Sequence, residues 1–411
     1  MPRLSRRSAS PRLLLVVATL ATGPATVALA RGAVEIGTQQ VELQLLVPWE
    51  ADHPLTAPLT TLVEQFNADN DGRATVTVEA IGDADRYERR LAALGPESEP
   101  TVVLLDPRSP MVRRADRLMD LKAELEGSWA SSFVPGALAA VRGGQAPEVQ
   151  LTVPFEYRMA PIWYHNGIFN AAGLDEFPGT ATELATAVAR LRAASATPAE
   201  VGDDADAAAY WFSYLAVSAG GPEVWDRPFT DAALLTAAEA LQLLYWQPPA
   251  EERPYASGRV ATTVADDRAI PALRGDSASV HAASRAARAP AVGEHAGFLL
   301  GSPVSALAAT RSNDQRRNDA MLNLIRWLTL PANAVLLTEE SGRMFAIRYS
   351  VVRNIDAMLA ELMRATRAAT SVALPFAAAH PDAPFAEALA DLASGRATPD
   401  VFLTLLQSTG S

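Results

Sequence analysis

Two short segments carry side chains that together can hold a polyhydroxylated ligand. The first runs from Pro48 to His53 and contains Trp49 and Glu50, and the second begins at Asp106. An indole ring can cover the apolar face of a pyranose, and carboxylates can accept hydrogen bonds from its hydroxyl groups. These residue types therefore point to the capture of a sugar. A packed tryptophan beside solvated acids is the alternative interpretation.

Both segments follow stretches that we expect to be neighbouring β-strands. Strand-like patterns occupy residues 41–47, 74–80 and 101–105, and apolar side chains at helical spacing lie between them, at 59–66 and 87–94. This βαβαβ order predicts an open, mostly parallel sheet. Because ligands bind beyond the carboxyl ends of the strands in such sheets, both polar segments are expected at one binding edge.

The composition excludes several classes of protein. The chain of 411 residues has no cysteine, which rules out disulfides, thiolate metal sites and a cysteine nucleophile. Its formal net charge of −12 opposes nucleic-acid binding. The five histidines are scattered without ligand spacing, and nucleotide-binding and nucleophile motifs are missing. We therefore expect no metal, no cofactor and no catalytic residue.

The amino terminus has the pattern of a secretory signal peptide. Arg6 and Arg7 belong to a basic region, residues 13–21 are apolar, and Ala28-Leu29-Ala30 is a small-x-small cleavage site. The apolar run is shorter than the roughly 20 residues that span a bilayer, so we expect cleavage after residue 30. An uncleaved anchor and twin-arginine export are the alternatives. Since no cysteine is available for lipid attachment, the expected location is the periplasm of a bacterium with two membranes.

The middle of the chain carries the most informative pattern. Its features, in order, are Pro154 in an extended run, an aromatic strand ending at Tyr164-His165-Asn166, a helical turn from Phe169 to Asp175, and a helix with a capping box of Thr180 and Glu183. In this order they closely resemble the family 1 extracellular solute-binding proteins. Those proteins are the sugar-capturing receptors of bacterial ATP-driven importers.

The resemblance extends over nearly all of the chain after residue 30. Residues 269–285 resemble a family segment in which a small helix ends at Gly275 and a strand follows. Residues 313–330 resemble a family helix, which we expect Ser312 and Gln315 to cap and Pro331 to end. Residues 394–398 and the final helix resemble the carboxyl end of the family.

The fold implied by the resemblance is α/β and periplasmic-binding-protein-like, with two α/β lobes of open, mostly parallel sheets joined by a hinge of three crossovers. The crossovers are expected near residues 153–157, 289–297 and 342–347. The implied domains are a signal peptide at 1–30, a first lobe at 41–154 and 297–342, and a second lobe at 155–296 and 343–408.

Further candidate ligand-binding residues lie at the crossovers and in the second lobe. The crossovers supply Glu156, Tyr157 and Arg343. Four aromatic residues fall within positions 210–214, and helical neighbours point about 100° apart, so we expect at least one to face the cleft. Our choice is Trp211, joined by Trp225 from the following loop.

One departure from the family concerns Arg285. Relatives usually have an aromatic residue near the end of the strand that follows Gly275, whereas this neighbourhood holds Ser284 and Arg285. An arginine in the pocket would suit an acidic or phosphorylated sugar. A solvated helix residue is the equally open alternative.

The resemblance implies a binding protein without a chemical step. Ligand contacts from both lobes would exist only in the closed state, which the permease subunits of an ABC transporter would recognise. The expected ligand is a carbohydrate or related polyol, and the chain is expected to be a monomer. A receptor that feeds a signalling system is one alternative. A secreted glycan-active enzyme is another, with Glu50 and Asp106 as its two carboxylates.

Overall fold

The computed structural model describes residues 40–96, 98–107, 109–142, 145–146, 148–200, 206–228, 230–245, 254–348, 355–368, 371–373 and 383–409. Residues 39–411 belong to one compact unit, which holds all of the described elements. The signal peptide predicted at residues 1–30 lies outside the described residues.

The first lobe is built on a five-stranded sheet with the strand order β2-β1-β3-β11-β4. Its strands are β1 (Val41–Val47), β2 (Ala74–Ala80), β3 (Thr101–Leu105), β4 (Val153–Pro154) and β11 (Ala306–Ala309). Strand β1 pairs in parallel with β2 and β3, whereas β11 is antiparallel to β3 and β4. The predicted βαβαβ unit is confirmed.

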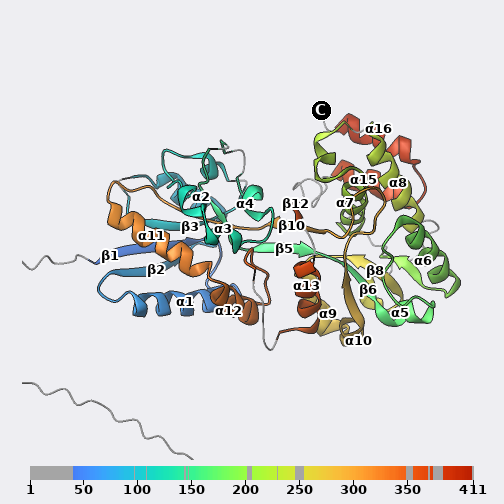
Figure 1. Cartoon of the computed structure of the whole chain (residues 1–411), viewed down its shortest axis with the longest axis horizontal. Helices are drawn as coiled ribbons and strands as arrows, with labels where there is room; N and C mark the ends of the chain where they lie inside the picture. The colour runs from blue at the N-terminus through green and yellow to red at the C-terminus, as the bar shows by residue number, and fades with distance from the viewer. Residues whose placement is uncertain are drawn as a thin grey trace, which may run out of the picture. The chain divides into compact units, whose positions relative to one another are not determined.

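Helices cover both faces of this sheet (Figure 1). They are α1 (Thr56–Asp69), α2 (Ala84–Ala93), α11 (Gln315–Leu328) and α12 (Pro331–Ser341), with short turns η1 (Pro110–Arg113), η2 (Ala123–Leu125), α3 (Ser128–Ser131) and α4 (Ala137–Ala140). Leu43 and Leu45 pack with α1 and α11 on one face, and Leu46 packs with α2 on the other. Burial on both faces explains the apolar runs in these strands.

The predicted cap of α11 is wrong. Asp314 caps this helix by accepting a hydrogen bond from the backbone N–H of Arg316 at 2.9 Å. Ser312 instead accepts a hydrogen bond from the N–H of Asp314 at 3.1 Å. The helix begins two residues later than the Ser312–Gln315 pattern predicts, because Asp314 and not Ser312 accepts a hydrogen bond from a free N–H group of the first turn.

The second lobe contains two smaller sheets. The four-stranded sheet has the order β7-β8-β6-β9, with β6 (Ile162–His165), β7 (Thr197–Ala199), β8 (Val260–Val264) and β9 (Ser284–Ala287). The three-stranded sheet has the order β12-β10-β5, with β5 (Tyr157–Ala160), β10 (Leu299–Pro303) and β12 (Ser371–Ala373). Strand β6 is antiparallel to both of its neighbours.

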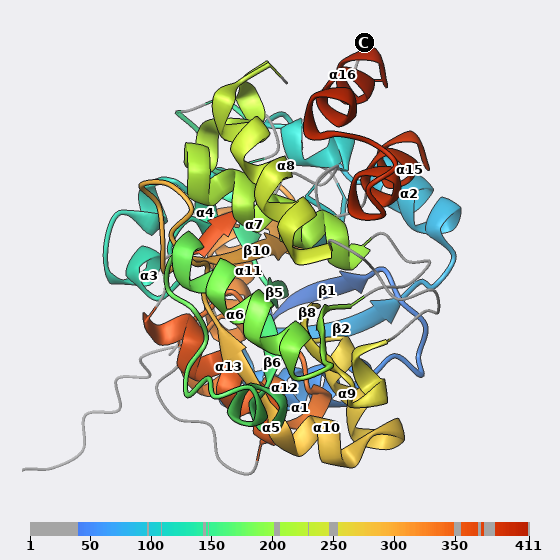
Figure 2. The same cartoon turned by 90° about the vertical axis from the view of Figure 1, so that its right-hand side faces the viewer.

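Helices α7, α8, α15 and α16 pack against one another in the second lobe (Figure 2). The helices and turns of this lobe are α5 (Asn166–Ala171), α6 (Ala181–Ala193), α7 (Asp206–Gly220), η3 (Pro222–Asp226), α8 (Ala232–Tyr245), η4 (Tyr255–Ser257), α9 (Ala269–Asp276), α10 (Ala278–Ala283), α13 (Ala357–Ala368), α15 (Ala383–Ala393) and α16 (Pro399–Thr409).

Two local predictions for this lobe have different outcomes. The capping box of α6 is confirmed, since Thr180 accepts from the N–H of Glu183 at 3.3 Å and Glu183 accepts from the N–H of Thr180 at 3.1 Å. The strand expected directly after Gly275 begins only at Ser284, because the alanine-rich residues 278–283 form helix α10.

The chain passes between the first lobe and the second lobe at three places. Between β4 and β5 it passes through Phe155 and Glu156, and residues 344–346 run beside this crossover. The N–H of Tyr157 donates to the carbonyl of Met344 at 3.0 Å, and the N–H of Ala346 donates to Phe155 at 2.8 Å. These positions agree with two of the predicted crossovers.

The remaining crossover lies later in the chain than predicted. Strand β10 still pairs with β5 as far as Pro303, and β11 joins the first sheet from Ala306. The chain therefore crosses at residues 304–305, and not at 289–297. That earlier segment is tied to the second lobe, where the N–H of Ala291 donates to Gly179 and the N–H of His295 donates to Ser218.

Among the described residues, no single helix is long and apolar enough to cross a membrane. Helices α11 and α12 pass that test only as a pair, bent by 57° at the break between them. Both have buried side chains in the core of the first lobe.

Candidate ligand-binding site

The loop after β1 places an aromatic pair next to α1. Trp49 is 9% exposed, and its ring stacks on that of His53 with 4.7 Å between centroids and 22° between planes. The N–H of His53 donates to the carbonyl of Glu50 at 3.1 Å, which closes the turn. Burial and the nearby Arg343 lower the pKa of His53. Arg343, which directly precedes the crossover at 344–346, therefore lies close to this loop.

Glu156 and Tyr157 lie next to each other in the first crossover but face different surroundings. Glu156 is 7% exposed, and its pKa is raised by burial, an effect that Arg343 opposes. Tyr157 lines a cavity of about 260 Å³ together with methionines 159, 344 and 363. Side chains alternate along an extended backbone, so the two residues point to opposite sides. Tyr157 is thereby separated from the charged groups around Glu156.

The turn between β8 and α9 supplies three functional candidates that the sequence analysis missed. Asp266 forms ion pairs with Arg268 at 2.8 Å and with Arg158 of β5 at 3.7 Å. Asp267 is 2% exposed, and none of the described residues donates a hydrogen bond to its Oδ1 atom. The available signal was an acidic pair directly after a buried strand, at the end where α/β proteins bind ligands.

Electrostatics connect this turn to the crossovers. Burial, together with the neighbouring Asp266 and Glu156, raises the pKa of Asp267 to about 7, and Arg343 opposes the shift. We define the polar cluster as Glu156, Asp266 and Asp267 with Arg158, Arg268 and Arg343. Its three carboxyl and three guanidinium groups carry no net charge when all are ionised. Arg268 is exposed and Arg343 is half-buried, so the cluster borders solvent.

Glu50 and Asp106 end up at the carboxyl ends of adjacent strands, as expected. Glu50 is exposed and lies against Gly82, where a Cβ atom would collide with the Glu50 side chain. Asp106 is half-buried, and its carbonyl accepts from the N–H of Ser109 at 2.9 Å. Their contact with ligand stays a prediction.

The prediction for Trp211 is wrong. Its side chain has 0% exposure and belongs to the core of the second lobe with Phe212 and Tyr214. All four neighbouring aromatic residues are buried, because α7 packs against β8 as well as against α8 and α15. Tyr210, not Trp211, approaches the polar cluster. The pKa of Arg268 is raised chiefly by its hydrogen bond to Asp266, and Tyr210 adds to the shift.

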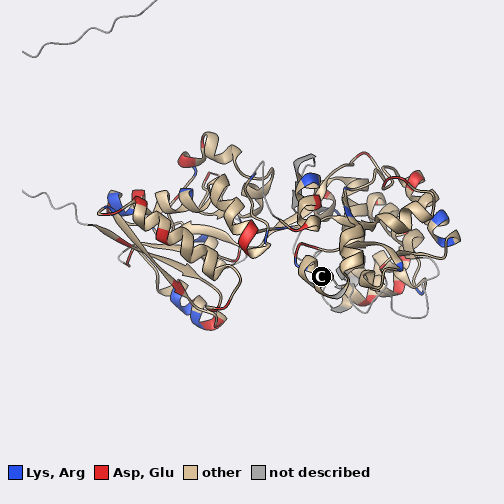
Figure 3. Ribbon diagram, turned by 90° about the horizontal axis from the view of Figure 1, so that it is seen from below, with Lys and Arg blue, Asp and Glu red and all other residues tan. Residues whose placement is uncertain are grey.

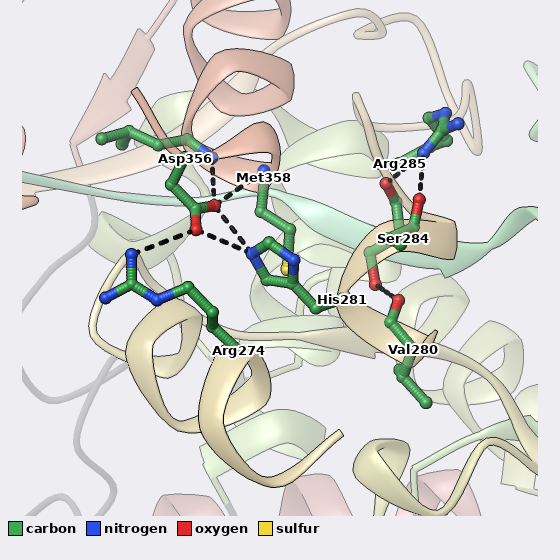
Figure 4. A network of polar contacts seen from close by, with 9 residues as sticks. Arg274, Val280, His281, Ser284, Arg285, Asp356 and Met358 are labelled. Carbon is green, nitrogen blue, oxygen red and sulfur yellow. Dashed lines mark hydrogen bonds and ion pairs between the residues drawn. The ribbon is translucent and has the colours of Figure 1, made fainter. Parts of the chain in front are cut away.

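Two other second-lobe candidates lie among structural partners. Trp225 is half-buried and packs edge-on against Phe212, with ring centroids 6.0 Å apart. Arg285 donates to the carbonyl of Ser284 at 2.8 Å (Figure 4). It also forms an ion pair with Glu361 of α13 at 3.8 Å. Arg285 therefore ties β9 to α13, and its role in binding an acidic sugar stays untested.

Acidic and basic positions are scattered over the described elements, and neither sign dominates a broad region of the ribbon (Figure 3). This distribution suits the expectation that nucleic acid is not a partner, because a nucleic-acid-binding face requires clustered lysine and arginine.

Comparison with known proteins identifies the family. The model of the bacterial extracellular solute-binding proteins matches residues 52–333. A probable secreted solute-binding lipoprotein from Streptomyces coelicolor is similar in structure, with a TM-score of 0.71 and 19% sequence identity over 89% of this chain and 98% of that one.

Two further solved structures are similar over comparable lengths. The apo form of RafE from Streptococcus pneumoniae has a TM-score of 0.70 and 15% identity, over 91% of this chain and 99% of that one. A family 1 extracellular solute-binding protein from Bifidobacterium longum subsp. infantis has a TM-score of 0.69 and 15% identity, over 90% and 99%. A search among proteins of curated function finds no match. The matched family model spans most of the chain, and the protein therefore belongs to the bacterial extracellular solute-binding proteins.

Proposed function

We propose that this solute-binding protein captures a carbohydrate or related polyol next to Trp49 and the polar cluster and delivers it to the permease subunits of an ABC transporter. The observation that carries the proposal is that the half-buried Arg343 lies close both to His53, on which the indole ring of Trp49 stacks, and to the buried carboxyl groups of Glu156 and Asp267. Such a combination provides a flat apolar surface and directional hydrogen bonds, both of which a sugar requires. RafE has been solved with raffinose, and another similar structure is a chitin oligosaccharide binding protein.

The proposed mechanism is closure of the two lobes around the ligand. Trp49 and His53 come from the first lobe, Asp266 and Asp267 come from the second, and Glu156 and Arg343 lie in the crossovers that join them. A ligand that contacts all three groups shifts the population toward the closed state. Gly342 ends α12 with a φ of 70° directly before Arg343, so a glycine-dependent turn sets the start of one crossover.

We also propose that the protein works in the periplasm after export and that it catalyses no chemical step. The first proposal is supported by the signal-peptide pattern and by membership of an extracellular family. The second is supported by the same membership, since solute-binding proteins deliver their ligand unchanged. Incubation with the ligand, followed by chromatography, should return it intact.

A thermal-shift screen tests the function directly. The panel contains raffinose, oligosaccharides of chitin, xylan and starch, sugar acids, amino sugars and polyols. A ligand present at 100 times its dissociation constant adds roughly 2.7 kcal/mol to the free energy of unfolding, which raises the melting temperature measurably. If no member of the panel raises the melting temperature of protein that is folded by circular dichroism, the carbohydrate proposal is wrong.

A further inference from the structure

Two members of the polar cluster have a buried side-chain atom without a hydrogen-bond partner among the described residues, the donor Nε of Arg158 and the acceptor Oδ1 of Asp267. The Oδ1 atom of Asp267 is buried and receives no hydrogen bond from any described residue, although the side chain is only 2% exposed. A buried acceptor without a donor lowers the stability of the folded protein, because the acceptor loses its hydrogen bonds to water. The neighbouring Asp266, in contrast, accepts hydrogen bonds from Nε of Arg268 at 2.9 and 3.0 Å, and it forms a longer ion pair of 3.7 Å with Arg158.

The surroundings of Asp267 determine which donor fits. A cationic donor would meet Arg343 from one crossover, and Arg158 and Arg268 through their shared partner Asp266. An anionic group would meet Glu156, Asp266 and Asp267 itself. Each kind of charged group would also be attracted by the groups of opposite sign, but the cluster carries no net charge when all of its groups are ionised. It therefore offers a charged ligand no net attraction to offset the loss of its hydration in a partly buried site. An uncharged hydroxyl group has a smaller hydration cost and still supplies the missing hydrogen.

We propose that Asp267 determines specificity by accepting a hydrogen bond from a hydroxyl group of a neutral carbohydrate, and that ligand binding releases a proton from its carboxyl group to solvent. This inference rests on the function proposed above and adds the ligand's charge and the residue that selects it. The hydroxyl group keeps its own proton and only shares it with Oδ1. The proton that leaves is the one that the Asp267 carboxyl holds in the ligand-free protein.

The direction of the pH dependence follows from this exchange. Burial raises the pKa of the ligand-free Asp267 to about 7, and a hydroxyl donor stabilises the ionised form. Affinity therefore increases with pH up to about 7 and levels off above it, with a dissociation constant ~30-fold weaker at pH 5.5 than at pH 8.5.

The other titratable groups around Asp267 contribute less to the pH dependence of affinity between about pH 5.5 and 8.5. Arg158, Arg268 and Arg343 stay charged throughout it. Burial and Arg343 lower the pKa of His53, so the imidazole is neutral over most of it. Glu156 also has a pKa raised by burial, which makes a Glu156→Gln variant a necessary second measurement.

The experiment is titration calorimetry with raffinose, or with the neutral oligosaccharide that gives the largest thermal shift in the screen. Dissociation constants are measured from pH 5.5 to 8.5, and binding at pH 7 is repeated in two buffers of different ionisation enthalpy. Wild type should release a fraction of a proton and show the ~30-fold dependence. Asp267→Asn, which keeps the side chain's size and an acceptor, should bind with almost no pH dependence, and Asp267→Ala should bind at least tenfold more weakly at pH 8. Asp175→Asn, at an exposed position of the same lobe, should match wild type.

The outcomes separate this inference from the proposed function. If no carbohydrate binds wild type at all, the proposed function fails first. If the oligosaccharide binds wild type with the same affinity at every pH and without proton release, or binds Asp267→Ala as tightly as wild type, the role of Asp267 is overturned and the carbohydrate function stands. If the pH dependence persists in Asp267→Asn but disappears in Glu156→Gln, the assignment to Asp267 is likewise overturned. Tighter binding of glucosamine or a uronic acid than of any neutral sugar would overturn the inferred ligand charge.

Discussion

Ionisation of Asp267 is costly for the folded protein because the carboxyl group is buried beside two other acids. Its pKa is raised from the ordinary value of 3.8 to about 7, so between these pH values the folded state holds a proton that the unfolded chain has already released. Between those two pH values the folded state binds more protons than the unfolded state. The free energy of unfolding therefore falls as pH rises through this window and levels off above about pH 7.

Asp267→Asn should remove that loss of stability. Relative to wild type, we expect the variant to become more stable as pH rises from ~4 to ~7, by at most about 4 kcal/mol, and to keep the difference at higher pH. Chemical denaturation at pH 5, 6, 7 and 8 measures the difference. The exposed Asp175→Asn variant is the control, and a constant difference between Asp267→Asn and wild type across this range would refute the buried-acid interpretation.

Trp49 should act as the apolar platform of the site. Its Nε1 atom is buried without a described partner, and its ring stacks on His53. Trp49→Ala should weaken oligosaccharide binding by more than about 1 kcal/mol, and saturating ligand should change the tryptophan fluorescence of wild type. Trp129→Ala is a suitable control, because Trp129 also belongs to the first lobe but donates to Thr329 at 3.0 Å and packs against Phe133. Equal loss of affinity in both variants would indicate general damage to the lobe.

At the scale of elements, Asp356 fixes the start of α13 against the rest of the second lobe. His281 of α10 lies 2.8 and 2.9 Å from the two carboxyl oxygens of Asp356, and Arg274 of α9 lies 3.6 Å away (Figure 4). The same carboxyl group accepts from the N–H of Met358 at 2.9 Å. One side chain thus caps α13 and connects it to α9 and α10, just after the chain has re-entered the second lobe.

Asp356→Ala should therefore lower the free energy of unfolding by about 1 to 3 kcal/mol, since it removes a helix cap and leaves His281 without this partner. Asp356→Asn keeps an acceptor for Met358 and should lose less than half as much. Denaturant titration of the three proteins checks this order. Unchanged stability in the alanine variant would mean that α13 is held by apolar packing alone.

Features encoded by neighbouring residues were predictable, and features that depend on distant segments were not. The capping box of Thr180 and Glu183 involves residues three positions apart, and alternation alone identifies β1 and β2. Burial of Trp211 depends on helices that follow α7 in the chain, so local spacing could not reveal it. The polar cluster could not be predicted from local sequence, because the fold brings Glu156 and Arg343 close to Asp267 from distant parts of the chain.

The position of the second crossover illustrates the same limit. Pro290 and Gly297 look like a break in the sequence, yet the segment between them remains attached to the second lobe. Strand β10 then continues to Pro303 because β5 offers it a pairing partner more than a hundred residues earlier in the chain. The chain consequently crosses between the lobes at residues 304–305, which lie between β10 and β11.

At the scale of the whole molecule, ligand capture by closure requires the three crossovers to bend together. Backbone hydrogen bonds tie Tyr157 to Met344 and Phe155 to Ala346, so two of the crossovers are expected to move as one. Arg343 directly follows Gly342 in this pair of crossovers. As the hinge bends, we expect its guanidinium group to move relative to the carboxyl groups of Glu156 and Asp267. We therefore expect binding and hinge motion to be coupled through the side chain of Arg343.

Small-angle X-ray scattering with and without the oligosaccharide tests this central claim most directly. We expect a smaller radius of gyration at saturating ligand, at pH 8, where the Asp267 carboxyl is mostly ionised. Asp267→Ala at the same ligand concentration should show a smaller decrease, in proportion to its lower occupancy. A scattering curve of wild type that is identical with and without saturating ligand, under conditions where calorimetry shows full binding, would contradict capture by hinge closure.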